Sequence, residues 1–117
     1  MHALQPAVLL RIYTEEGKMN NHRPLYEDIV IKARAAKLAG ATVLRGLMGY
    51  GLHATIHTAK ILDLSAKLPL VIEIVDTEER VRAFIPVLDA MVKDGLITLE
   101  TVEVIRYRVG EPKGERP

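Results

Sequence analysis

The stretch that decides the fold runs from Leu68 to Val92 and reads LPLVIEIVDTEERVRAFIPVLDAMV. Its first eight residues are apolar apart from Glu73, a short run that is typical of a strand. From Thr77 onward the apolar residues change to helical spacing, and Thr77 itself is a suitable N-cap. The residues with this spacing are Val81, Phe84, Ile85, Leu88, Met91 and Val92. The stretch therefore predicts a strand followed directly by a helix, with a kink where Pro86 removes a backbone donor.

A similar strand and helix are expected near the start of the chain. Residues 7–13 are apolar apart from Arg11 and predict a strand. Pro24 stands where the first position of a helix tolerates its missing N–H, and the helix should run to about Leu38, with Gly40 as its stop. Apolar residues recur on one face of this helix at Leu25, Ile29, Ala33 and Ala36.

Two more strands complete the predicted fold, one beginning at residues 41–44 and one over 98–109. The order strand, helix, strand, strand, helix, strand is that of the ferredoxin-like βαββαβ sandwich. The prediction is an α+β fold with a four-stranded antiparallel sheet and two helices on one face. One domain is expected over residues 1–117, with a core at about 7–109 and a flexible polar tail at 110–117.

The strands at 7–13 and 68–75 are apolar at both alternating positions, which indicates burial on both faces of the sheet. Two helices on one face leave the other face uncovered. Because a large exposed apolar sheet favours aggregation, we expect another copy of the chain to cover it. The sequence therefore predicts an oligomer.

Composition excludes several classes of protein. Sixteen basic and fifteen acidic residues give a formal charge of +1, which argues against nucleic acid as a partner. The absence of cysteine removes disulfides, thiol chemistry and cysteine-based metal sites. No signal-peptide pattern and no uninterrupted apolar run of about 18 residues is present, so we expect a cytoplasmic protein.

The segments 41–51 and 68–76 resemble the PII signalling superfamily, in which a glycine-rich strand end leads into a long mobile loop and a Leu-Pro-led strand returns. Together with 23–26 and 95–98, they more closely resemble an uncharacterised PII-like family of bacteria and archaea, over roughly residues 7–109. The resemblance implies a homotrimer whose sheets face a central axis, with adenine nucleotides bound in clefts between subunits. It also implies that the loop at 49–67 acts on a partner, which we expect to be a membrane transporter or channel or a regulated enzyme. Members of the PII-like family are often encoded near fluoride-export channels.

A candidate site for a small anion lies where the second strand ends. Arg45 is followed by Gly46, Gly49, Tyr50 and Gly51, so that backbone N–H groups and a guanidinium could meet a phosphate or carboxylate. The alternative is that these glycines only shape a bend between strand and loop.

Further basic residues could join this site. Arg106 and Arg108 would share one face of the last strand, and the resemblance implies a phosphate-binding role for basic residues there. Lys93 and Gly95 stand where PII proteins have a longer phosphate-binding turn. The alternatives are solvated arginines at a chain end and a lysine that complements the helix dipole.

His53 and His57 have the spacing of a metal-binding pair if their stretch is helical, and Asp63 or a second copy could add a ligand. The possible cofactors are thus an adenine nucleotide or a divalent metal such as zinc or copper. Polar loop histidines are the simpler interpretation.

No pattern of catalytic residues is evident, so we predict that the protein is not an enzyme. The leading hypothesis is a trimeric regulatory protein that binds a small anion, most readily an adenine nucleotide. The alternatives are a metal-binding trimer similar to CutA, and a structural interaction module without a ligand.

Overall fold

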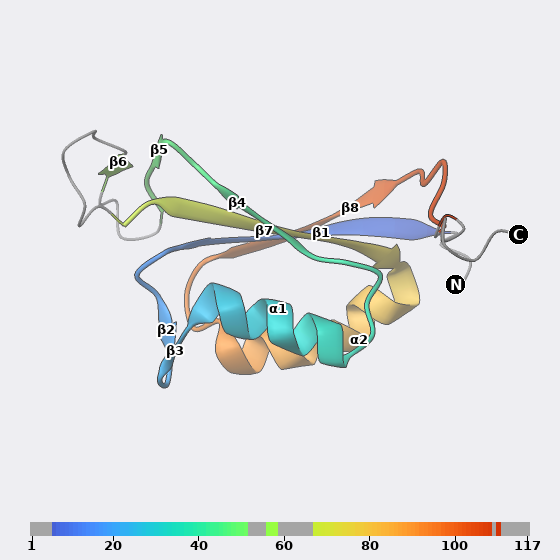
Figure 1. Cartoon of the computed structure of the whole chain (residues 1–117), viewed down its shortest axis with the longest axis horizontal. Helices are drawn as coiled ribbons and strands as arrows, with labels where there is room; N and C mark the ends of the chain where they lie inside the picture. The colour runs from blue at the N-terminus through green and yellow to red at the C-terminus, as the bar shows by residue number, and fades with distance from the viewer. Residues whose placement is uncertain (1–5, 52–55, 59–66, 109, 111–117) are drawn as a thin grey trace, which may run out of the picture.

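One four-stranded antiparallel sheet, in the order β4-β7-β1-β8, carries both helices on the same face (Figure 1). The computed structural model describes residues 6–51, 56–58, 67–108 and 110. The sheet strands are β1 (Ala7–Glu15), β4 (Thr42–Arg45), β7 (Pro69–Thr77) and β8 (Leu96–Val102), and the helices are α1 (Leu25–Ala35) and α2 (Glu78–Met91). Two small hairpin pairs join β2 (Met19–Asn20) to β3 (Arg23–Pro24) and β5 (Met48–Gly49) to β6 (His57–Thr58).

The chain order β1-α1-β4-β7-α2-β8, with β1 and β7 in the middle of the sheet, is the ferredoxin-like arrangement. The predicted fold class is therefore confirmed. Each of the four predicted strands and both predicted helices has a counterpart in the structure, with shifted ends.

The core lies between the helices and the even-numbered positions of the central strands. Ile12 is opposite Ile72 in the register, and Leu10 is opposite Ile74, with none of these side chains exposed. The helices contribute the apolar residues Leu25, Ile29, Ala33, Val81, Phe84, Leu88 and Met91. Alternation along the strands therefore sends one set of side chains to the helices and the other set to the opposite face.

Helix α1 ends earlier than predicted. After Ala35, the N–H of Leu38 donates to the carbonyl oxygen of Ala33 at 3.1 Å, and Lys37 takes a left-handed conformation with φ 61°. This is a Schellman-type ending, whose left-handed position is usually glycine. The prediction that Gly40 stops the helix was wrong, because Lys37 does so three residues earlier.

Helix α2 begins as predicted. The side chain of Thr77 accepts a hydrogen bond from the backbone N–H of Arg80 at 3.2 Å, as an N-cap does. The helix continues through Pro86 to Met91, so Pro86 does not end it.

Strand β8 is shorter than predicted, ending at Val102 and not at 109. Its one neighbour in the sheet is β1, and Val102 already faces Ala7, the first residue of β1. Among the described residues, no strand lies opposite residues 103–108, which explains the early end.

The face of the sheet opposite the helices is termed the open face. No described element covers it (Figure 1). At its centre Arg11 contacts Glu73 through Nε at 2.9 Å and Glu100 through Nη1 at 2.7 Å. Apolar side chains flank this polar row, and they are Leu9, Tyr13, Leu44, Val71, Val75 and Leu96. The open face is thus less uniformly apolar than the strand pattern predicted.

Part of the predicted loop at 49–67 is described. Gly49 pairs with His57, so β5 and β6 form a small hairpin-like pair beyond the main sheet (Figure 1). Residues 52–55 and 59–66 lie outside the described part, as does the predicted tail at 110–117 apart from Gly110. Among the described helices, none has the length and apolar character needed to span a membrane.

Candidate functional site

Arg45, the first candidate for anion binding, is the last residue of β4. Its Nη2 donates to Oε2 of Glu16 at 2.9 Å, and the arginine side chain remains 64% exposed. The glutamate is the more enclosed partner, with a side chain 22% exposed. The candidate guanidinium is therefore accessible from solvent while it is paired with a carboxylate of the same chain.

Glu16 makes two further contacts with Leu68, the residue before β7. Its Oε1 accepts a hydrogen bond from the N–H of Leu68 at 3.0 Å, and its own N–H donates to the carbonyl oxygen of Leu68 at 3.0 Å. One side chain thus contacts both ends of the segment between β4 and β7. We call Glu16, Arg45 and Leu68 the arm base.

The glycines after Arg45 allow the chain to pack closely against Pro69. The N–H of Gly46 donates to the carbonyl oxygen of Pro69 at 2.8 Å, and a Cβ at Gly46 would lie 3.0 Å from Cγ of that proline. At Gly49 the corresponding distance is 3.4 Å, and at Gly51 no atom of the described residues lies within 4 Å. The N–H of Gly46 is therefore used inside the protein, as the alternative of a shaped bend requires. Tyr50 beside them is 73% exposed.

Lys93 and Gly95 lie at the turn between α2 and β8. Nζ of Lys93 contacts the carbonyl oxygen of Ala90 at 3.4 Å, near the end of α2, where a positive charge complements the helix dipole. Gly95 has φ 138°, and a Cβ there would lie 3.0 Å from the carbonyl oxygen of Tyr13. The backbone of this turn therefore requires glycine whether or not a ligand binds.

Arg106 and Arg108 are exposed and follow the end of β8. The prediction that they share the face of a strand was wrong, since the strand ends at Val102. Between them, the hydroxyl of Tyr107 donates to the carbonyl oxygen of Ala39 at 2.7 Å. This contact holds the segment against the connection between α1 and β4.

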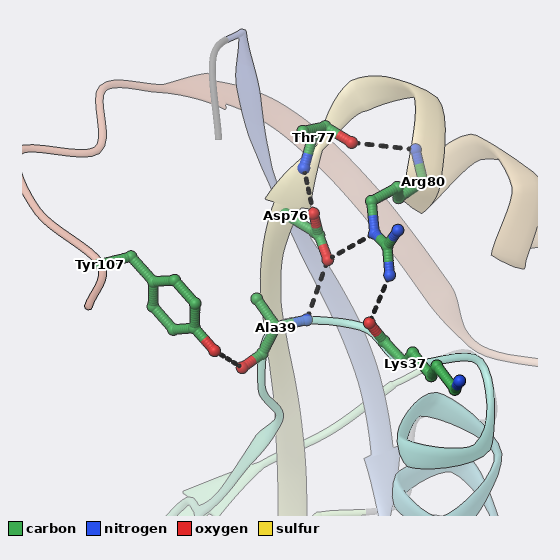
Figure 2. A network of polar contacts seen from close by, with 6 residues as sticks. All are labelled: Lys37, Ala39, Asp76, Thr77, Arg80 and Tyr107. Carbon is green, nitrogen blue, oxygen red and sulfur yellow. Dashed lines mark hydrogen bonds and ion pairs between the residues drawn. The ribbon is translucent and has the colours of Figure 1, made fainter. Parts of the chain in front are cut away.

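Figure 2 shows the polar network to which this contact belongs. The fully buried carboxylate of Asp76 accepts hydrogen bonds from the N–H of Ala39 at 2.9 Å, from the N–H of Thr77 at 2.6 Å, and from Nε of Arg80 at 3.2 Å. Nη2 of Arg80 also donates to the carbonyl oxygen of Lys37. A buried charge is tolerated here because each oxygen of the carboxylate has a donor.

The candidate residues fall into three separate places in one chain. Arg45 and Gly95 lie on opposite edges of the sheet, three strand spacings or roughly 14 Å apart. Arg106 comes after the end of β8, at the opposite end of the sheet from Arg45. Val102 and Thr77 both face Ala7, whereas Arg45 faces Leu70, so these two ends of the sheet are about 23 Å apart along β7. The structure brings Arg45 together with Gly46 and Gly49, and it does not bring Arg106 and Arg108 to them.

The predicted metal ligands cannot be placed. His53 lies outside the described residues, and of His57 only the backbone is described, in β6. Among the side chains that are described, no group of three or more histidine, aspartate or glutamate residues could hold a metal ion.

Comparison with known proteins assigns the chain to a family. The family model DUF190, described as "Uncharacterized ACR, COG1993", matches residues 7–104. The chain belongs to the DUF190 family. A UPF0166 protein of Aquifex aeolicus (strain VF5) is 41% identical over 97 residues, covering 83% of this chain and 91% of that protein. A UPF0166 protein of Methanocaldococcus jannaschii is 34% identical over 101 residues, covering 86% and 93%.

Solved structures show what this DUF190 protein resembles in fold. A CPII of Thiomonas intermedia K12 bound to ADP and bicarbonate aligns with a TM-score of 0.56 and 24% identity, covering 89% of this chain and 93% of that chain. A structure of the same PII-like protein with ADP, AMP and bicarbonate aligns with a TM-score of 0.56, 23% identity and coverage of 89% and 92%. The fold of this DUF190 protein is therefore PII-like, and the predicted family is confirmed.

Two residues of these polar contacts, Glu16 and Asp76, were not predicted from the sequence. Asp76 could have been found, since it occupies an even position of β7 like Leu70, Ile72 and Ile74, which alternation sends into the core. A buried aspartate needs partners, and this would have pointed to Arg80 one helical turn later. Glu16 gave no such signal, because its contacts come from β4 and from the residue before β7.

Proposed function

We propose that this DUF190 protein is a homotrimeric regulatory protein that binds a small anion between its subunits, and that this anion is an adenine nucleotide. The segment at 49–67 would then act on a partner, either a membrane transporter or channel or a regulated enzyme. The main support for the proposal is that the candidate basic residues lie at opposite ends of one sheet, Arg45 at one end and Arg106 and Arg108 at the other.

Arg45 is accessible at one end, and Arg106 and Arg108 are exposed at the other. Guanidinium groups form strong, often bidentate hydrogen bonds with phosphate, and several of them around one nucleotide would bind it far better than one alone. A single subunit cannot bring these residues together. A neighbouring subunit whose far end lies beside Arg45 would complete the site.

The open face supports assembly. Tyr13, Leu44 and Leu96 are exposed there by 38%, 47% and 56%, around the ion pairs of Arg11. Burial of such apolar side chains against other copies is favourable, and a closed ring of three satisfies every copy equally.

The choice of ligand is supported by the structures with a similar fold, since the two CPII structures contain ADP, and one of them also contains AMP. Arg45 and a neighbour's arginines would contact the phosphates of such a nucleotide. We also propose that the nucleotide is bound and not hydrolysed, because the described residues present no nucleophile paired with a base.

Calorimetry with ADP tests the site. Removing a charged hydrogen bond typically costs about 1.5–3 kcal/mol, so Arg45→Ala should weaken ADP binding by roughly ten- to a hundredfold. Arg82→Ala is the matched control, since Arg82 lies on α2 and pairs with Glu78 at 2.9 Å. Equal affinities of wild type and Arg45→Ala would contradict the proposed site, and steady turnover of ATP by the pure protein would contradict the non-catalytic role.

Mixed assembly tests whether the site is shared between subunits. Arg45→Ala and the double variant Arg106→Ala/Arg108→Ala should each bind ADP poorly. After the two are unfolded and refolded together in equal amounts, about a quarter of the sites should regain both sets of arginines, if subunits mix at random. Absence of recovery in verified mixed trimers would place all contacts within one chain. Light scattering measures the assembly itself, and a stable monomer at micromolar concentration would contradict the proposal.

A further inference from the structure

The arm base, formed by Glu16, Arg45 and Leu68, places a carboxylate of this chain on the guanidinium that the proposed ligand would use. Glu16 meets Arg45 with Oε2 at 2.9 Å and the N–H of Leu68 with Oε1 at 3.0 Å. Both oxygens of the carboxylate are therefore engaged, each with a different end of the segment between β4 and β7.

The two partners differ in how easily they can move. The side chain of Glu16 is 22% exposed and is held by Leu68, whereas that of Arg45 is 64% exposed. Among the described residues, Glu16 is the side chain to which Arg45 donates a hydrogen bond. An arriving anion would therefore displace the arginine from the glutamate, while the glutamate stays close to the backbone.

A carboxylate and a phosphate present similar oxygen acceptors to a guanidinium. A phosphate that took the Nη2 donor would remove the Glu16 contact. A phosphate that approached other donors of Arg45 would place two negative groups beside one positive group, which is unfavourable. In either geometry the glutamate opposes binding of the anion.

We propose that Glu16 is a built-in competitor of the anionic ligand at Arg45, and that its release transmits binding to the segment that starts at Gly46. This inference rests on the proposed function. When Arg45 turns to the ligand, Oε2 of Glu16 loses its donor, and the end of β4 is no longer joined to Leu68 through a side chain. The hydrogen bond between the N–H of Gly46 and the carbonyl oxygen of Pro69 remains. The side-chain contacts within the arm base are therefore weakened, while β4 and β7 stay paired.

The experiment compares Glu16→Gln with wild type in ADP calorimetry. The amide oxygen of glutamine can still accept from Leu68, while the negative charge that competes for Arg45 is gone. Since exposed ion pairs contribute little, the expected gain is about two- to fivefold tighter binding. In the Arg45→Ala background the same substitution should have no effect. Glu27→Gln is the matched control, because it removes one exposed carboxylate from α1, a helix that supplies no residue of the proposed site, and should leave affinity unchanged.

Hydrogen exchange at the amide of Leu68 is the second measurement. Saturating ADP should speed this exchange in wild type and leave it unchanged in Arg45→Ala. Thermal melts and light scattering of each variant check that it is folded and assembled.

The outcomes separate the two proposals. If Arg45→Ala weakens ADP binding while Glu16→Gln binds as wild type does, the proposed function stands and the competitor is overturned. Slower or unchanged exchange at Leu68 on ADP binding overturns the transmission step. If neither wild type nor Glu16→Gln binds ADP, the proposed function itself fails, and the competitor with it.

Discussion

The hydroxyl of Tyr107 donates a hydrogen bond to the carbonyl oxygen of Ala39 at 2.7 Å, across 68 positions of the chain. The N–H of Ala39 donates in turn to the buried carboxylate of Asp76 at 2.9 Å. Through one residue, the segment after β8 and the end of β7 are both joined to the connection between α1 and β4 (Figure 2). The position of Arg106 and Arg108 therefore depends on a loop far away in the sequence.

Tyr107→Phe should release the segment that carries these arginines. The lost hydrogen bond contributes about 0.5–1.5 kcal/mol, and its effect should stay local because none of the described strands pairs with the segment. Trypsin should then cleave after Arg106 and Arg108 several-fold faster, as measured by mass spectrometry. Tyr26→Phe, on α1, serves as the control. Equal cleavage in Tyr107→Phe and wild type would mean that other contacts hold the segment.

Asp76→Ala should destabilise the fold strongly. It leaves the N–H groups of Ala39 and Thr77 and Nε of Arg80 without their acceptor, so we expect a loss of about 2–4 kcal/mol in the free energy of unfolding. Urea denaturation followed by circular dichroism, at one fixed protein concentration, measures it. Asp89, an exposed acid on α2, gives the control Asp89→Ala, which should stay within about 0.5 kcal/mol of wild type. Similar losses in both variants would show that the network contributes little.

Lys37→Gly should stabilise the protein by about 0.5–1 kcal/mol. Lys37 has φ 61° at the end of α1, a conformation that glycine adopts without steric cost. Removal of the steric cost at this position outweighs the additional conformational entropy that glycine loses on folding. The same substitution at the exposed Lys32, inside α1, should destabilise by about 1 kcal/mol. Thermal melts of the two variants should therefore shift in opposite directions, and a lower melting temperature for Lys37→Gly would contradict this account.

Gly95→Ala should cost about 1–3 kcal/mol, since a Cβ would lie 3.0 Å from the carbonyl oxygen of Tyr13 and φ is 138°. Gly51→Ala, at a position where none of the described atoms would lie within 4 Å of the new Cβ, should be close to neutral. Chemical denaturation without any ligand checks the pair. If Gly95→Ala were as stable as Gly51→Ala, the turn could adopt another conformation.

Arg11→Ala should weaken the proposed assembly, because it leaves Glu73 and Glu100 without their countercharge on the open face. Light scattering should show dissociation at protein concentrations where wild type and the control Arg82→Ala remain oligomeric. High salt should partly restore the assembly by screening the carboxylates. An unchanged molar mass would exclude the open face as the interface.

The charge of Arg11 should not itself make assembly depend on pH. The hydrogen bond with Glu73 is the largest influence that raises the pKa of Arg11, burial acts against it, and the charges of Glu100 and Glu73 add to the increase. Because the pKa of Arg11 is raised in the folded state, the stabilisation by its charge is fully present at every pH below the ordinary pKa of arginine. It is lost only as the pH rises through the pKa of the folded state. Arg11 therefore stays charged at every pH near neutrality.

The sequence by itself determined the order and type of the main elements and the family. The apolar run at 68–75 and the helical spacing from Val81 to Met91 are local patterns, and they survive in the structure because they match the faces that the strand and the helix bury. Thr77 as an N-cap was equally predictable, since its partner lies three residues away. Local signals of this kind need no knowledge of the rest of the chain.

The tertiary structure alone decided where β8 ends, what Arg45 contacts and how far apart the candidate basic residues lie. Val102 ends β8 because β1 begins opposite it, and Arg45 meets Glu16 because β4 and β7 bring their ends together. Asp76 and Tyr107 both form hydrogen bonds with the backbone of Ala39, which is far from each of them in the sequence. These features depend on which segments the fold places side by side, and periodicity along one segment carries no information about its partners.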